Sequence, residues 1–151
     1  MLGVAQLRDA SVEDADRLPP PFDRRVRHVA SENARVLAAV IAFEHGDREA
    51  LRSLFAASHA SMRDDYEVSI PAIDALVDRA VADPDVIAAR LTGGGFGGSI
   101  VAIARAGTAA VAGARVVAAY QDLRAERPAV LVPMRPPVAV AIAEEGPCSP
   151  S

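Results

Sequence analysis

The segment of this sequence that is best suited to chemistry is the glycine-rich run at residues 92–99. The run reads Thr92-Gly93-Gly94-Gly95-Phe96-Gly97-Gly98-Ser99, with five glycines in eight positions. Glycine loses more conformational freedom on folding than any other residue, so this density needs a reason, such as positive φ angles or close approach of a ligand. Successive backbone N–H groups in such a loop can converge on an anion, whereas a plain hairpin turn needs only one or two glycines. We therefore predict a phosphate- or nucleotide-binding loop made of Thr92, Gly93, Gly94, Gly95, Phe96, Gly97 and Gly98.

Two common nucleotide motifs do not fit this segment. Gly93, Gly95 and Gly98 have the G-x-G-x-x-G spacing of a dinucleotide site, but the last glycine of that motif must open a helix. Here an apolar, strand-like run follows at residues 99–104. The segment also lacks the Gly-Lys-Ser/Thr ending of a Walker A loop. The sequence pattern therefore argues against both nucleotide motifs.

Aspartate and histidine residues are candidates for catalytic groups, but their sequence context favours structural roles. Asp64 and Asp65 could hold a metal for phosphoryl transfer, but acids at a helix end are more often capping or solvated residues. His59 has no Ser/Asp partner that the sequence would place beside it, so we expect a hydrogen-bonded structural histidine. His28 and His45 are expected at the surface. We name no catalytic residue and no metal ligand.

The arginines offer two further candidates. Arg24, Arg25 and Arg27 form a basic cluster that could meet an anion, but acids lie close by in sequence. A solvated helical face is therefore the expectation for the cluster. Arg90 lies just before the glycines and could orient them through the carboxylate of Asp64 or Asp65.

Two helices are predicted in the first half of the chain. Apolar residues recur at helical spacing over residues 23–45, and His45-Gly46 supplies a stop. Asp47 can cap a second helix, which we expect to end near residues 64–66.

A third helix, two strands and a fourth helix follow. Ser69 can cap the third helix, which has Pro71 in its first turn and ends before Asp83-Pro84. Apolar runs at residues 86–91 and 99–104 flank the glycines in the manner of paired strands. Thr108 can cap a fourth helix, and residues 129–132 form an apolar run that predicts a closing strand.

This order of elements predicts an α+β fold in which helices pack on a small antiparallel sheet. We divide the chain into an N-terminal arm or linker at residues 1–22, a domain at residues 23–135, and a tail at residues 136–151. The arm ends in a Leu-Pro-Pro-Pro run that favours extended backbone. The tail is rich in proline, and we expect it to be disordered.

Composition narrows the class of protein. The chain has 151 residues, enough for one domain with a real core, and a formal net charge of −4 that offers no basic field for nucleic acid or anionic lipid. Cys148 is the single cysteine, so neither an internal disulfide nor a zinc motif can form. No stretch has the length and apolarity of a membrane span or a leader peptide. We expect a cytoplasmic protein.

Two long motifs resemble one family. Residues 58–69, Ser-His-Ala-Ser-Met-Arg-Asp-Asp-Tyr-Glu-Val-Ser, and residues 89–98, Ala-Arg-Leu-Thr-Gly-Gly-Gly-Phe-Gly-Gly, are similar to the C-terminal domain of galactokinases, which are GHMP-type sugar kinases. Shorter matches at residues 2–9 and 24–35 extend the resemblance over most of residues 1–134. The family usually has Gly-Val-Tyr-Gly-Ala-Arg before the glycines, whereas residues 85–90 lack both of those glycines, and Ser99 replaces a common cysteine.

The resemblance implies a fold, a reaction and cofactors. It implies that the glycines close the γ-phosphate pocket against the ATP loop of an N-terminal domain, in an enzyme that uses ATP and Mg to phosphorylate galactose or a related sugar. It also places the catalytic aspartate, the transition-state arginine and most sugar contacts upstream of this chain. We therefore expect this chain to be inactive as a kinase on its own.

Three hypotheses remain open at this point. The first is the C-terminal portion of a galactokinase-like enzyme that works with an N-terminal half supplied in trans. The second is a non-catalytic module that binds a small ligand or a protein, including a second copy, through the face that the missing half would cover. The third is a truncated remnant without function.

Overall fold

The computed structural model describes residues 2–121 and 128–133. In order, its elements are η1 (Leu7–Asp9), α1 (Val12–Ala15), α2 (Phe22–His45), α3 (Arg48–Asp64), α4 (Pro71–Ala82), β1 (Val86–Thr92), β2 (Ser99–Ala104) and α5 (Ala109–Gln121). The strands β1 and β2 form an antiparallel hairpin that pairs Thr92 with Ser99 at its closed end. The α+β class is confirmed.

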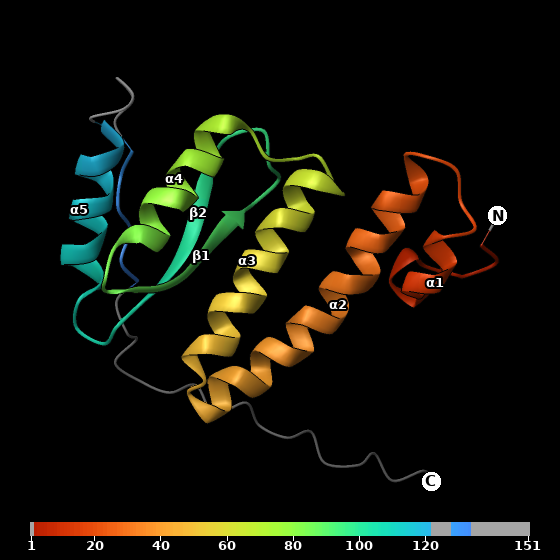
Figure 1. Ribbon diagram of the computed structural model, residues 1–151, viewed down its shortest axis with the longest axis horizontal. Coiled ribbons are helices and arrows are strands. Elements are labelled where there is room, and N and C mark those ends of the chain that lie inside the picture. Colours follow the sequence, from red (N-terminus) through yellow and green to blue (C-terminus); the bar gives the residue numbers. More distant parts are fainter. Residues whose placement is uncertain (1, 122–127, 134–151) are drawn as a thin grey trace, which may run out of the picture.

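The main core lies where α3, α4 and α5 meet β1. Seen as in Figure 1, α5, the hairpin with α4, then α3, α2 and α1 follow one another across the molecule. Leu91 on β1 is fully buried, and Met62, Val77 and Val116 from the three helices belong to the same buried cluster. This core anchors the strand that leads directly into the glycines.

Local sequence signals explain the turn between α2 and α3. Gly46 ends α2 in the left-handed conformation, with φ of 63°, and its N–H bonds back to the last turn of the helix. The carboxylate of Asp47 then accepts from the N–H of Ala50 and caps α3. The helix stop and the cap predicted from these two residues are both confirmed.

The predicted cap of α4 is wrong. Ile70, not Ser69, occupies the N-cap position, and no side chain caps the helix. The Ser69 hydroxyl donates instead to Oδ1 of Asp74, at 2.5 Å. An N-cap hydroxyl must accept from an N–H of the first turn, but Ser69 lies one residue before the N-cap position and uses its hydroxyl as a donor. Pro71 in the first turn has no N–H, so one group that a cap would satisfy is missing.

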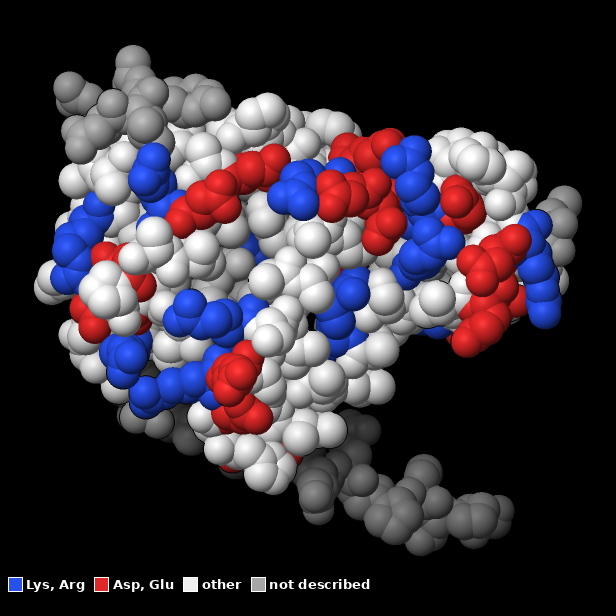
Figure 2. Space-filling model, in the orientation of Figure 1, with Lys and Arg blue, Asp and Glu red and all other residues white. Residues whose placement is uncertain are grey.

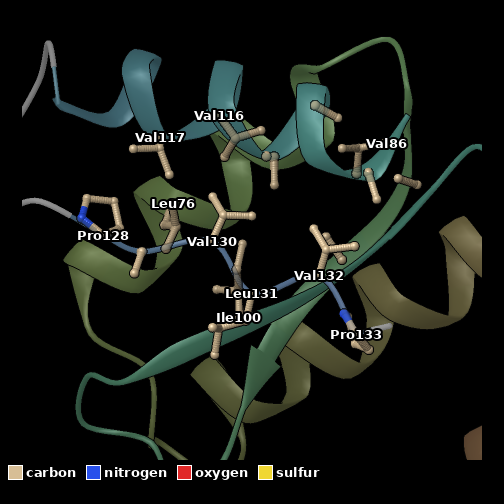
Figure 3. A pocket seen from close by; sticks show the side chains of 17 residues that line it. Leu76, Val86, Ile100, Val116, Val117, Pro128, Val130, Leu131, Val132 and Pro133 are labelled. Atoms are coloured by element: carbon tan, nitrogen blue, oxygen red, sulfur yellow. The ribbon is translucent and has the colours of Figure 1, made fainter. Parts of the chain in front are cut away.

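The predicted strand at residues 129–132 is also wrong. Among the described residues the sheet has two strands, and residues 128–133 pair with neither. Figure 3 shows Val130, Leu131 and Val132 lying over an apolar hollow of about 190 Å³ that Leu76 and Val116 also line. Side-chain packing against α5 replaces a backbone ladder here. We call residues 128–133 the strap.

The N-terminal residues form a small second cluster. The arm predicted over residues 1–22 contains η1 and α1. Ala10, which follows η1, and Ala15 at the end of α1 form a buried cluster with Val26 of α2. The tail predicted at residues 136–151 lies outside the described residues. None of the described helices combines the length and apolarity required to cross a bilayer.

Candidate phosphate-binding loop

The glycines form the connection between β1 and β2, and we call residues 93–98 the glycine loop. Gly93, Gly95, Gly97 and Gly98 have φ values of 86°, 83°, 126° and 86°. Phe96 also has a positive φ, 58°, and its side chain is 72% exposed. A backbone with this many positive φ angles is accessible to glycine and strained for other residues. The density of glycine is therefore explained by conformation.

The backbone N–H groups of the loop are mostly free. In the part of the chain that the structure describes, Phe96 is the one loop residue whose N–H donates to the protein, at 2.7 Å to the Val68 carbonyl. The N–H groups of the loop glycines have no protein acceptor there. Unpaired donors at the surface can bind water or an anion.

Gly95 is required for a second reason, which is space. A Cβ atom at Gly95 would lie 2.5 Å from both Cβ and the carbonyl oxygen of Val68. The other loop glycines leave open space or ordinary contact at this position. Val68 was not among the candidate site residues predicted from the sequence. The signal that could have found it is the run Glu67-Val68 within the motif at residues 58–69.

Beside the loop lies an apolar hollow. It has a volume of about 350 Å³ and is lined by Ile70 and Ile73 from the start of α4, by Tyr120, and by Gly97 and Gly98 themselves. A ligand held by the loop amides would therefore have apolar surface on one side.

His59 fixes the strand that enters the loop. Its Nδ1 accepts from the N–H of Leu91 at 3.3 Å, and its Nε2 lies 3.2 Å from Oδ1 of Asp74. This arrangement assigns the proton of the neutral ring to Nε2. Burial lowers the pKa of His59, against the opposing charge of Asp74. The prediction of a hydrogen-bonded structural histidine agrees with this geometry.

Arg90 does not orient the loop through Asp64 or Asp65, so this interpretation was wrong. The guanidinium turns toward α2 and α3, where it donates to Ser58 at 2.8 Å and lies 3.3 Å from Glu32. Successive side chains of a strand point to opposite faces, and Arg90 lies on the face that directs its side chain toward Ser58 of α3.

Two expectations about α2 were also wrong. His28 is buried, not exposed: its ring stacks on Tyr66 with 4.5 Å between centroids, and its Nδ1 lies 3.0 Å from the Ser61 hydroxyl. Arg24 and Arg25 are not a solvated face, because both bind the carboxylate of Glu67. The partner lies more than forty residues away, which explains why sequence proximity to other acids misled the interpretation.

The two aspartates at the end of α3 are engaged with neighbours. Asp64 accepts from Arg63 at 2.8 Å, and Asp65 accepts from the Ser61 hydroxyl at 2.8 Å. Within residues 2–121 and 128–133, no group of three or more histidine, cysteine or acidic residues could hold a metal ion.

Comparison with known proteins agrees with the geometry of the hairpin and its helices. The family model "GHMP kinases C terminal" matches residues 39–122, which contain the glycine loop. The crystal structure of Lactococcus lactis galactokinase complexed with galactose matches at 31% identity with a TM-score of 0.72. The match covers 82% of this chain and 33% of that chain, so this chain spans about a third of that galactokinase. On these findings, the chain belongs to the GHMP kinase family and has the fold of that family's C-terminal domain.

Proposed function

We propose that this chain is the phosphate-side part of a galactokinase-like kinase, which transfers a phosphoryl group from ATP to galactose or a related sugar. The observation that carries the proposal is the glycine loop, whose five glycine N–H groups are free of protein acceptors among the described residues. The solved galactokinase that this chain resembles carries galactose, which supports the choice of sugar.

In this proposal, the chain's own residues bind and enclose phosphate. The backbone N–H groups of the five loop glycines would donate to phosphate oxygens, and the apolar hollow beside Gly97 would exclude water. When bound, ATP would supply the transferred group and Mg would neutralise its charge. The described residues offer no carboxylate cluster for that metal, so its ligands would come from an N-terminal kinase half.

The isolated chain should bind nucleotide weakly. A hydrogen bond to a charged group contributes about 1.5–3 kcal/mol, whereas association costs roughly 4–15 kcal/mol. Two or three such bonds therefore barely offset the cost, and affinity for ATP should be millimolar or weaker. Activity requires an N-terminal kinase half that provides the acid–base and metal-binding groups, and we place both halves in the cytoplasm.

Complementation tests this function. The chain would be mixed with the part of Lactococcus lactis galactokinase that it does not match, and ATP-dependent phosphorylation of galactose would be measured. We expect activity only when both are present. Gly95→Ala should reduce that activity by about a hundredfold or more, because mispositioning of catalytic donors by about 1 Å can have this effect.

Gly46→Ala is the matched control, because Gly46 also has a positive φ but lies at the far end of α2, with no atom within 4 Å of the position that a Cβ would take. It should leave complemented activity within about twofold, since its strain is remote from the loop. Equal losses in the two variants, or micromolar binding of ATP to the isolated chain by calorimetry, would contradict the proposal.

A second candidate function is protein binding through α2. The second half of this helix carries large apolar side chains that are more than half exposed: Val36, Leu37, Val40, Ile41 and Phe43. Figure 2 shows a largely uncharged surface over this part of the molecule. Contiguous exposed apolar surface is typical of an interface, and either an N-terminal kinase half or a second copy of this chain would bury it.

A further inference from the structure

We propose that Arg24, Arg25 and Glu67 are positioning residues that fix the conformation of the glycine loop through Val68. We call these three residues the arginine clamp. The proposal rests on the proposed function only for its consequence in catalysis, because the conformation of the loop can be measured without any ligand.

The glycine loop contacts the segment that joins α3 to α4. The N–H of Phe96 donates to the Val68 carbonyl at 2.7 Å, and Gly95 lies so close to Val68 that no Cβ would fit. The middle of the loop is thus seated on Val68. A displacement of this residue must move Gly95 and Phe96 with it, because close-packed atoms transmit such shifts.

The position of Val68 depends on the residues before it. Its N–H donates to the carbonyl of Met62, and the preceding residue, Glu67, has a φ of 58°. A residue other than glycine keeps a left-handed conformation only where its surroundings hold it there. The segment therefore needs an external restraint at Glu67.

The clamp supplies that restraint. Arg24 donates to Oε1 of Glu67 at 2.6 Å and to the carbonyl of Asp64 at 3.3 Å. Arg25 donates to Oε2 of the same carboxylate and to the carbonyl of Asp65. Each guanidinium thus ties the Glu67 side chain to the last carbonyls of α3, which fixes the direction in which the backbone leaves the helix.

The surroundings of the clamp support this assignment. Hydrogen bonds from Arg25 and Arg24 lower the pKa of Glu67, so its carboxylate is charged at neutral pH. Tyr66, the residue before it, stacks on His28 one turn further along α2. Acidic and basic side chains crowd together over the upper ends of α2 and α3 in Figure 2. The first turns of α2 thus hold residues 64–68 at several points.

Amide hydrogen exchange of the full chain tests the clamp. In Glu67→Ala, exchange at the Phe96 N–H should rise about tenfold, because the bond to Val68 opens more often, while exchange at Leu91 stays unchanged. Glu67→Gln can still accept a hydrogen bond and should give an intermediate value. Asp16→Ala is the matched control. Asp16 pairs at 3.2 Å with Arg27, which lies on α2 as the two clamp arginines do but, within the described part of the chain, has no hydrogen bond or ion pair to the loop segment.

Unchanged exchange at Phe96 in folded Glu67→Ala would overturn the proposal. If that variant does not fold, Arg24→Gln retains the Arg25 half of the clamp and should show a smaller rise of the same sign, and no rise there would overturn it equally. In the complemented kinase, Glu67→Gln should raise KM for ATP more than KM for galactose. A rise in exchange without this KM effect would support the clamp and count against the phosphate role of the loop.

Discussion

His59 and His28 link the stability of the chain to pH. Burial lowers the pKa of both rings in the folded state. In the unfolded chain each ring has the ordinary histidine pKa of about 6.5, so near and below that pH the unfolded state binds more protons than the folded state. The free energy of unfolding is therefore highest above about pH 6.5, where both states have neutral rings. It decreases as the pH falls through the pKa of the unfolded state toward the lower pKa of the folded state. In His59, protonation of Nδ1 would also remove the acceptor of the Leu91 N–H.

We expect the melting temperature to fall by several degrees between pH 7.5 and pH 5.5, as measured by circular dichroism. Carboxylates with lowered pKa, such as Glu32, lose their contribution only in more acidic solution. His59→Asn, whose side-chain oxygen can replace Nδ1 as acceptor, should remove part of the dependence. A flat profile for the unaltered chain would contradict the expectation.

At the scale of single residues, sequence reasoning identified conformational requirements better than partners. The positive φ angles of the loop could be predicted because only glycine density was needed. The partners of Arg24 and Arg90 could not be predicted, because each partner is distant in sequence and is brought close only by tertiary packing. Glu67 is 43 positions from Arg24, and Glu32 is 58 positions from Arg90. The role of the loop residues in binding phosphate stays a prediction.

The strap and α5 offer a test at the scale of elements. Gly113 lies within α5, where replacement by alanine would normally stabilise a helix by about 1 kcal/mol. Here a Cβ would lie 2.6 Å from Cγ1 of Val130. Gly113→Ala should therefore be neutral or destabilising by urea denaturation in the unaltered chain, because the strap must shift.

The double variant separates packing from helix propensity. In a Val130→Ala background the clash is gone, and Gly113→Ala should stabilise by about 1 kcal/mol, the propensity gain alone. If Gly113→Ala stabilises equally in both backgrounds, the strap does not pack on α5 in solution.

At the same scale, the helices and the hairpin could be predicted, and the edges of the fold could not. Apolar periodicity, Gly46 and Asp47 determine α2 and α3 locally, and the glycines between two apolar runs determine the hairpin. The apolar run at residues 129–132 suits a strand or an extended segment without a ladder equally well, because both have the same extended backbone. The structure leaves Leu131 91% exposed, so the apolar composition of the run did not signal a buried strand. Ser69 likewise had two acceptable partners, and Asp74 lies within its reach.

For the whole molecule, the exposed face of α2 predicts association. Fully burying a side chain such as leucine stabilises by about 1.5–3 kcal/mol, and Leu37 and Ile41 are 69% and 58% exposed. We expect a concentration-dependent mass in light scattering of the purified chain, reduced to that of a monomer by Leu37→Glu. Val111→Glu, at a position on α5 that is 59% exposed, is the control and should leave association unchanged.

Addition of an N-terminal kinase half should suppress this self-association if both use the same face. A chain that is monomeric at every concentration, and whose complemented activity is unaffected by Leu37→Glu, would exclude α2 as an interface.

The separate cluster around Ala10, Ala15 and Val26 has a consequence for how the chain opens. Among residues 2–121 and 128–133, η1 and α1 pack mainly on α2 and share no buried residue with the core around Leu91. We therefore expect the N-terminal segment that contains them to form a unit of cooperativity of its own. Such units open below the free energy of global unfolding. Brief proteolysis under native conditions should therefore remove this unit first and leave a fragment whose hairpin is intact.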